Sequence, residues 1–150
     1  MEITEEFWVA ECGNPAPPVR EQLVILTARE IARVGTEAFN AKDVCDLVGA
    51  KYPMINYYFG SREGLLQAAA MRTHDLWITN VRNALSSKPS EPLKQLKAIC
   101  KAEVAFAKEW GQMALLATHP PQTSSALSLD EDKDLDSVVE RREANTELYL

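Results

Sequence analysis

The sequence predicts an all-α protein, and three observations lead to this fold class. Apolar residues recur in several segments at the three- and four-residue spacing of one helix face. No segment keeps the apolar–polar alternation of a half-buried strand. The chain has 150 residues, 46% of them hydrophobic, which suffices to bury a core without any apolar run of membrane-spanning length.

Residues 1–18 are predicted to form an acidic arm that is mobile or extended. They contain four Glu and no basic residue, and three prolines between residues 15 and 18 lie close to Gly13. Within this arm, Phe7 and Trp8 are expected to pack on the rest of the protein.

Residues 19–66 are predicted to form a helix-turn-helix domain. Its first helix has an apolar stripe made of Leu23, Leu26, Thr27, Ile31 and Val34. Asn40 is a helix N-cap residue, and after it one buried helix face is expected at Val44, Leu47 and Val48. Gly49 fits the end of this second helix, because Gly adopts the positive φ that a sharp turn requires.

The next predicted helix, roughly residues 52–59, is the one that could read a base sequence. Its inward face is expected to contain Ile55, Tyr58 and Phe59. Other positions, outward or flanking, are Lys51, Pro53, Met54, Asn56 and Tyr57. Their amide, phenol, thioether and ammonium groups can contact base edges and phosphates. A solvated face on a purely structural helical hairpin explains the same local pattern.

The most specific run in the sequence is INYYFGSREGLL, residues 55–66, which follows a cap residue, a short apolar helix and Gly49. With these elements, the segment from Gly35 to Leu66 resembles the DNA-binding domain of the tetracycline-repressor-like (TetR/AcrR) family of bacterial transcription regulators. The resemblance extends over roughly residues 20–70, about a third of the chain. It implies that the residues in contact with DNA are Lys42, Lys51, Tyr52, Met54, Asn56, Tyr57 and Arg62.

Three features depart from the family pattern. Lys51 stands where Ser or Thr is usual, so the recognition helix loses its customary side-chain cap. Thr36 and Phe39 are exchanged relative to the usual order, which removes a hydroxyl that often meets phosphate. Glu30 falls on the inward stripe of the first helix.

The net charge of −6 is unevenly distributed along the chain. Residues 1–18 carry −4, residues 19–66 carry six basic and six acidic groups, and residues 67–150 carry ten basic and twelve acidic groups. A helix-turn-helix domain with no net charge can still bind DNA if its basic groups cluster on one side, because the salt-sensitive part of the affinity depends on the number of local phosphate contacts. Weak non-specific binding is therefore expected.

Residues 67–150 are predicted to form a helical ligand-binding and dimerisation domain. A long helix is expected from Ser61 to about Leu85 and another from about Glu91, with a break or kink at Gly111. The remainder is expected to be a short apolar segment (113–117), a loop (119–130) and a last helix (from about 132). The family pattern continues with two further helices, so this domain is expected to be either a short variant or incomplete.

The large apolar side chains of this domain have two interpretations. They can simply fill a core, as aromatic and Met residues at helical spacing usually do. The family resemblance indicates instead a pocket for a small apolar effector, lined by Met71, Trp77, Phe106, Trp110 and Met113.

The sequence contains no convincing catalytic or cofactor-binding constellation. No nucleophile–base pair, Gly-rich phosphate loop or metal-ligand cluster has a suitable spacing, so neither an enzyme nor a cofactor or metal is expected. An EF-hand calcium loop starting at Asp132 would need Gly where Ser137 stands, and an acidic helix N-terminus is the simpler explanation. His74 and His119 are expected to be surface or satisfied core groups.

The three cysteines, Cys12, Cys45 and Cys100, are far apart, and the acidic N-terminus does not resemble a signal peptide. A cytoplasmic protein with reduced thiols and no membrane partner is therefore expected. The resemblance implies a homodimeric transcriptional repressor that binds a palindromic operator in double-stranded DNA and is released by a small apolar ligand. The alternative is a helical protein-interaction module that keeps the fold without reading DNA.

Overall fold

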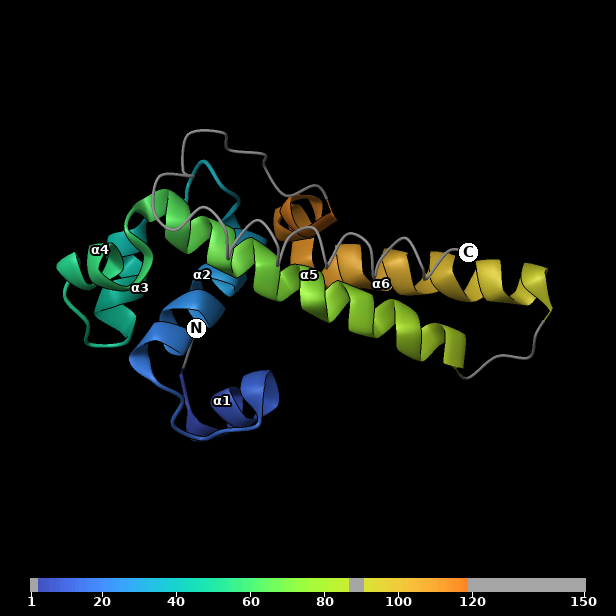
Figure 1. The fold of residues 1–150 in the computed structure, drawn as a ribbon, viewed down its shortest axis with the longest axis horizontal. Coiled ribbons are helices and arrows are strands. Elements are labelled where there is room, and N and C mark those ends of the chain that lie inside the picture. Colours follow the sequence, from blue (N-terminus) through green and yellow to red (C-terminus); the bar gives the residue numbers. More distant parts are fainter. Residues whose placement is uncertain (1–2, 87–90, 119–150) are drawn as a thin grey trace, which may run out of the picture.

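The computed structural model describes residues 3–86 and 91–118, which form six helices and, within these ranges, no strand. The predicted all-α fold class is therefore confirmed. Helices α1 to α4 gather at one end of the molecule, and the long helices α5 and α6 run side by side away from them (Figure 1). The predicted loop after residue 118, the helix from about 132 and the EF-hand interpretation lie outside the described residues.

Helix α1, Glu5–Cys12, corrects the prediction that the N-terminal arm is mobile or extended. Thr4 caps this helix by accepting a hydrogen bond from the amide of Phe7 at 3.2 Å, and Gly13 ends it at a φ of 72°. Trp8 is buried, as expected, and its apolar area helps to hold α1 on the protein. The prolines that suggested an extended arm all follow α1, so they belong to the connection to α2.

Helix α2, Val19–Val34, lies at the centre of the fold and packs against α3, α5 and α6. Its expected apolar stripe is confirmed, since four of the five members are fully buried: Leu23, Leu26, Thr27 and Ile31. Glu30 lies at the edge of this stripe and accepts a 2.6 Å hydrogen bond from Arg33. This bond lowers the pKa of the Glu30 carboxyl, so the acid stays ionised beside the core.

Helices α3, Ala41–Leu47, and α4, Pro53–Phe59, form the predicted helix-turn-helix together with α2. The predicted burial of Leu47 is wrong, because its side chain is 45% exposed. Helix α3 ends at Leu47, and the residues that it buries are Ala41, Val44 and Cys45. The three-residue spacing from Val44 therefore turns Leu47 toward solvent, while Cys45 takes the inward position.

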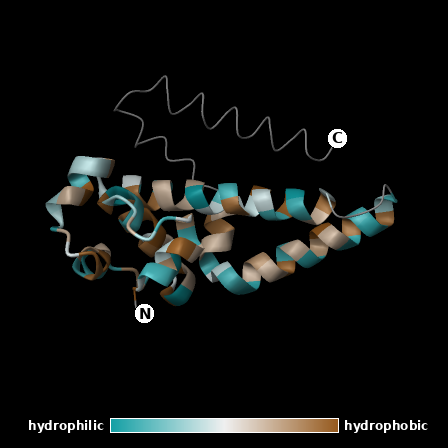
Figure 2. Cartoon of the chain, turned by 90° about the horizontal axis from the view of Figure 1, so that it is seen from below, coloured by the Kyte–Doolittle hydropathy of each residue, from teal (hydrophilic) through white to brown (hydrophobic). Residues whose placement is uncertain are grey.

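The long helices are α5, Arg62–Ser86, and α6, Pro92–Thr118. Both helices carry hydrophobic and hydrophilic residues along their whole length, as expected for amphipathic helices (Figure 2). The predicted kink at Gly111 is confirmed, with φ 49° and ψ −128°. A Cβ at this position would lie 2.8 Å from the carbonyl oxygen of Ala32, so Gly111 lets α6 approach the backbone of α2 closely.

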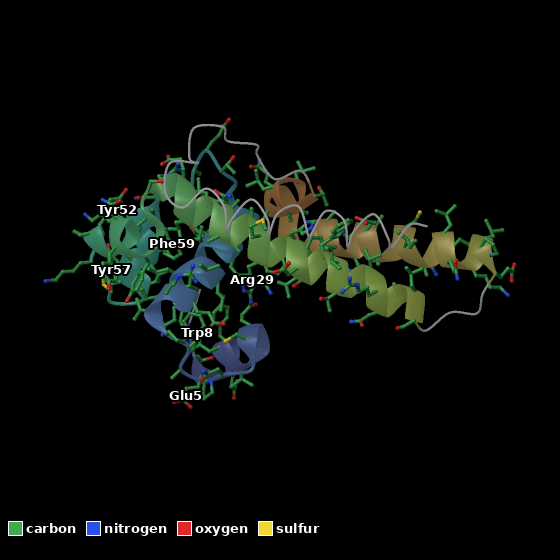
Figure 3. The ribbon with its side chains drawn as sticks, in the orientation of Figure 1. Glu5, Trp8, Arg29, Tyr52, Tyr57 and Phe59 are labelled. Carbon is green, nitrogen blue, oxygen red and sulfur yellow. The ribbon has the colours of Figure 1, made fainter. Side chains whose placement is uncertain are left out.

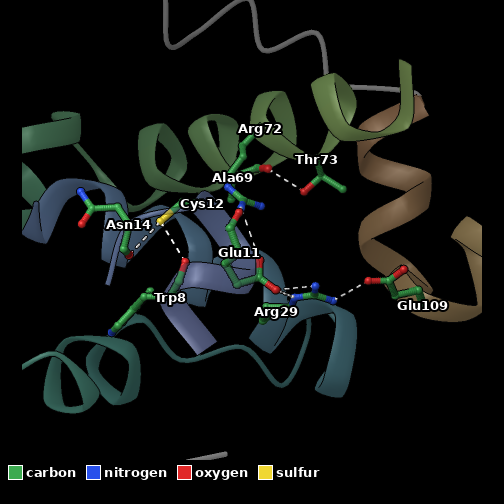
Figure 4. Close-up of polar contacts among 9 residues, drawn as sticks. All are labelled: Trp8, Glu11, Cys12, Asn14, Arg29, Ala69, Arg72, Thr73 and Glu109. Atoms are coloured by element: carbon green, nitrogen blue, oxygen red, sulfur yellow. Dashed lines mark hydrogen bonds and ion pairs between the residues drawn. The ribbon is translucent and has the colours of Figure 1, made fainter. Parts of the chain in front are cut away.

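One hydrophobic core runs through both of the predicted parts of the chain, and α5 crosses the predicted boundary at residue 66 without interruption. An ion-pair cluster joins four helices beside this core (Figure 4). In it, Glu11 of α1 contacts Arg29 of α2 at 2.5 Å and Arg72 of α5 at 3.3 Å. Arg29 also contacts Glu109 of α6 at 3.1 Å and lies 3.9 Å from the ring centroid of Trp110.

Candidate nucleic-acid interface

The turn between α3 and α4 is built from a cap at one end and a glycine at the other. Asn40 Oδ1 accepts a hydrogen bond from the amide of Lys42 at 3.1 Å, and Asn40 Nδ2 donates to Asp43 at 2.9 Å. Gly49 adopts a φ of 67°, which redirects the chain toward α4 as the sequence predicted. The Ala50 amide then donates to the carbonyl of Cys45 at 2.9 Å, so the turn is held by the end of α3.

Helix α4 has the two faces that its sequence predicts. Ile55 is fully buried, and the rings of Tyr58 and Phe59 are partly buried against the core. On the opposite side Tyr57 is 83% exposed and projects from the end of the molecule where α4 lies (Figure 3). Tyr52 precedes α4 and is 44% exposed.

Most of the remaining predicted contact residues are exposed or partly exposed as well. Lys42, Lys51 and Asn56 are exposed, and Met54 is partly exposed. No side chain caps the N-terminus of α4, where Tyr52 is the cap residue, in agreement with the expected effect of Lys51. The structure therefore brings an amide, two phenols and an ammonium group to one surface without burying them.

Arg62 lies at the edge of this surface and is engaged within the protein. Its guanidinium donates to the carbonyl of Phe39 at 3.5 Å and lies 5.4 Å from the centroid of the Phe39 ring. Its contact with Glu63 is long, at 3.9 Å. These contacts hold the loop before α3 against the start of α5, so Arg62 positions the helix pair as well as adding positive charge.

The orientation of α4 is fixed by its junction with α5. Gly60 adopts a φ of 74°, and its amide donates to the carbonyl of Asn56 at 3.0 Å. Ser61 Oγ then accepts from the amide of Gly64 at 3.1 Å. A Cβ on Gly64 would lie only 2.0 Å from the carbonyl oxygen of Phe59, so the close approach of the two helices requires glycine there.

Two residues near this surface were missed by the sequence reasoning. Arg20, at the start of α2, is exposed and lies 5.2 Å from the centroid of the Phe59 ring, which places another cation beside α4. Gln112 of α6 accepts a 3.1 Å hydrogen bond from the amide of Thr36, so Thr36 contacts the body of the protein. The expected kink at Gly111 was the only feature of the sequence near Gln112 that could have suggested a contact there.

The basic residues of the helix-turn-helix domain differ in whether they pair with acidic residues of the same protein. Arg29 and Arg33 are bound to acidic residues of the protein. Lys42 near the start of α3 and Lys51 just before α4 are exposed and make no ion pair within the described residues. A domain with no net charge therefore still presents unpaired basic groups in its helix-turn-helix.

The five residues expected to line an effector pocket do not lie together on an open surface. Four of them are buried in the core, namely Trp77, Phe106, Trp110 and Met113, whereas Met71 is partly exposed. The Phe106 and Trp110 rings stack at 5.9 Å, and Trp77 Nε1 donates to Glu103 at 2.8 Å. Their packing agrees with the core interpretation. His74 is also a satisfied core group, since its Nδ1 lies 2.8 Å from the carbonyl oxygen of Ala117.

In the part of the chain that the structure describes, no group of three or more His, Cys, Asp or Glu residues could hold a metal ion. Among the same residues, no helix is both long and apolar enough to cross a membrane. All three cysteines are free, and burial raises the pKa of the Cys45 thiol.

Comparison with known proteins identifies the segment that contains this surface. Residues 25–69 match the family described as bacterial regulatory proteins, tetR family. The matched range begins within α2, includes α3 and α4, and ends within α5. No curated protein and no solved structure shows a significant match to the chain.

Proposed function

We propose that this chain, whose residues 25–69 match the family described as bacterial regulatory proteins, tetR family, is a DNA-binding transcriptional repressor that acts as a homodimer. The observation that supports DNA reading by α4 is its division into a buried and an exposed face. Ile55 is anchored in the core, while Tyr57, two residues later, is 83% exposed. A helix held in this way presents its outer side chains to the major groove without leaving the protein.

Each exposed group on α4 has a distinct role in this proposal. Asn56 hydrogen-bonds an adenine edge in the major groove. Tyr52, Tyr57 and Lys51 hold phosphates and so fix the position of the helix on the duplex. In a two-fold dimer the two copies of α4 enter successive major grooves, about 34–36 Å apart, on a palindromic operator.

Release by a small apolar ligand is the second part of the proposal. Trp110 and Met113 of α6 are buried on either side of the kink at Gly111, and Gln112 accepts a hydrogen bond from the amide of Thr36, just after α2. A ligand that displaced Trp110 or Met113 would therefore act on a helix turn that contacts the DNA-reading end directly. If the ligand binds the DNA-free arrangement more tightly than the DNA-bound one, it lowers the affinity of the protein for the operator.

The test is a fluorescence-anisotropy titration of the full chain against genomic fragments and then against the operator they identify. Asn56→Ala should cost about 1–3 kcal/mol and relax one base position. The matched control is Asn83→Ala, because Asn83 is exposed on α5 in the long-helix hairpin. Equal affinities of both variants and the parent would refute the role of Asn56.

The salt dependence tests the role of the lysines. With Lys42 and Lys51 from each of two protomers, the slope of log K against log salt should be roughly −3 to −4. Lys51→Ala should weaken binding to all sequences and reduce that slope by roughly 2 for a dimer. Lys97→Ala on α6 is the charge-matched control and should leave the slope unchanged, whereas equal slopes for the two variants would contradict the assignment.

The alternative is a helical interaction module that does not read DNA. The observation in its favour is the balanced charge of residues 19–66. This alternative predicts no saturable binding to any genomic fragment, even at low salt, so the same titration separates the two functions.

A further inference from the structure

Arg20 differs from the other arginines of residues 19–66 in its contacts. Within the described residues its exposed side chain makes neither an ion pair nor a hydrogen bond. Arg20 Cζ lies instead 5.2 Å from the centroid of the Phe59 ring, which attracts the charge but does not neutralise it. Its N–H donors therefore remain available to an anion. The other arginines are bound to glutamates or to a backbone carbonyl: Arg29, Arg33 and Arg62.

The start of α2 holds the backbone of Arg20 in place. Pro17 is buried, and its carbonyl oxygen accepts a 2.7 Å hydrogen bond from Gln22 Nε2. Leu23 and Val24, three and four positions after Arg20, lie on the same side of the helix and are buried. No acid therefore follows Arg20 on this side in the next turn, and the arginine stands at the edge of the core.

The ring that Arg20 contacts belongs to the helix proposed to enter the major groove. Phe59 is the last residue of α4 and the inner end of a row of three rings. The Tyr57 and Tyr58 centroids are 5.0 Å apart, and those of Tyr58 and Phe59 are 6.2 Å apart. Both pairs are edge-on, which is a favourable arrangement of aromatic rings. The row thus links the exposed Tyr57 to the guanidinium of Arg20.

Two cations lie at opposite ends of α4. Lys51 precedes the helix, and Arg20 contacts its last residue. A helix of seven residues extends for about 10 Å, and the major groove is about 12 Å wide. A helix of this length in the groove has its ends near the sugar–phosphate walls. A cation that reaches such an end from a neighbouring helix meets phosphates before it meets base edges.

We propose that Arg20 binds a phosphate at the edge of the groove that α4 enters, and that Phe59 positions its guanidinium for this contact. This role rests on the proposed binding of DNA by α4. The planar fork of a guanidinium matches two oxygens of one phosphate. Such a contact fixes the position of α4 on the duplex and does not select a base sequence.

A purely structural role for Arg20 gives a different expectation. A long charged side chain can cover an apolar ring while its charge stays in water. Removal of Arg20 would then change the stability of the protein but not the salt dependence of DNA binding. The salt dependence is therefore the measurement that separates the two roles.

Fluorescence anisotropy of the full chain with a DNA duplex tests the proposal through Arg20→Gln, which removes the charge but keeps a polar side chain. In a dimer this change removes two phosphate contacts, so the slope of log K against log salt should become less negative by about 2. The ratio of parent to variant affinity should accordingly fall about tenfold between about 50 and about 200 mM salt. With Arg20 included, the slope of the parent should be about −5.

Two controls separate charge at this position from charge elsewhere. Arg82→Gln is the matched control, because Arg82 is exposed and lies about 30 Å along α5 from the first residue of that helix. It should leave the slope unchanged. Arg20→Lys keeps the charge and should restore most of the slope, since an ammonium also neutralises phosphate. If Arg20→Lys and Arg20→Gln lose the same slope, the phosphate assignment is wrong.

A second duplex distinguishes phosphate from base contact. A phosphate contact carries no sequence information, so Arg20→Gln should weaken binding by the same factor on the operator and on an unrelated duplex of equal length. A loss confined to the operator would indicate a base contact and would overturn the phosphate assignment.

A double-mutant cycle tests the role of Phe59. Phe59→Leu keeps an apolar side chain but removes the ring face. It should weaken DNA binding severalfold in the parent and by a smaller factor in the Arg20→Gln chain, where the guanidinium is already absent. Any effect on the packing of α4 is common to both chains and cancels. Equal factors in the two chains would show that Phe59 does not position Arg20.

Failure of this role and failure of the proposed function give different results. If the parent binds no duplex saturably, DNA binding by α4 is wrong and the role of Arg20 falls with it. If the parent binds and Arg20→Gln keeps its affinity and slope, DNA binding stands and only the role of Arg20 is refuted. An unchanged urea midpoint for Arg20→Gln excludes unfolding as the cause of any loss.

Discussion

Glu11→Gln tests whether the ion-pair cluster holds α1 on the rest of the protein. The Glu11 side chain is only 8% exposed, and its two partners, Arg29 and Arg72, are 24% and 18% exposed. Gln keeps the size of the side chain and one acceptor oxygen, but it removes the charge that both arginines share. Arg29 retains Glu109, whereas Arg72 retains only the carbonyl oxygen of Glu11 at 2.7 Å.

The expected loss follows from this geometry. Removing one partner of a fully buried ion pair costs about 3–5 kcal/mol, and hydrogen bonds to charged groups contribute about 1.5–3 kcal/mol each. Because both arginines keep some contact with water, we expect Glu11→Gln to lower the free energy of unfolding by about 2–3 kcal/mol. Arg72 Nη1 is already buried without a partner, so the structure has little means to compensate.

Urea denaturation of the full chain measures this loss as a shift in the midpoint at constant slope. With a slope of about 1.5–2 kcal/mol per molar, the midpoint should fall by about 1–2 M. Glu109→Gln is the matched control, since Glu109 is 57% exposed and its pair with Arg29 should contribute about 0–1 kcal/mol. An unchanged midpoint for Glu11→Gln, or an equal shift for both variants, would refute the reasoning.

Two further predictions concern Gly64 and Cys45. Gly64→Ala places a Cβ 2.0 Å from the Phe59 carbonyl oxygen, so α4 must move, and we expect a loss of about 1–3 kcal/mol in urea denaturation together with weaker operator binding. Its neighbour Glu63→Ala is the control, and equal effects of the two changes would argue against the steric explanation. Burial raises the pKa of Cys45, so less of this thiol is ionised at any given pH and it should be the slowest of the three to react with iodoacetamide in the folded protein. Mass mapping of the labelled peptides checks this, and labelling of Cys45 as fast as that of Cys12 would contradict it.

Local rules made much of the helix-turn-helix predictable. Asn40 caps α3, Gly49 turns the chain at positive φ, and Ile55 is buried while Tyr57 is exposed, as the sequence indicates. Each of these features depends on one residue type and its immediate neighbours. Leu47 was predicted incorrectly because the burial of a short helix near its end depends on where the helix stops, which the spacing of apolar residues does not define.

The N-terminal helix shows what local rules could not supply. The prolines and acids of residues 1–18 suggested an extended arm, yet Thr4 and Gly13 enclose a helix that Trp8 and Glu11 attach to the protein. Arg29 and Arg72 are 43 residues apart in the sequence, and only the packing of α2 against α5 brings both to the same carboxylate.

The sequence by itself determined that the protein is all-α, with a two-faced helix between the glycine turns at Gly49 and Gly60, because helix periodicity, caps and glycine conformations are properties of neighbouring residues. Only the tertiary structure decided that Arg62 binds Phe39 and that Gln112 reaches Thr36. These contacts join residues distant in the chain, and their energies depend on distances and burial that no local pattern encodes.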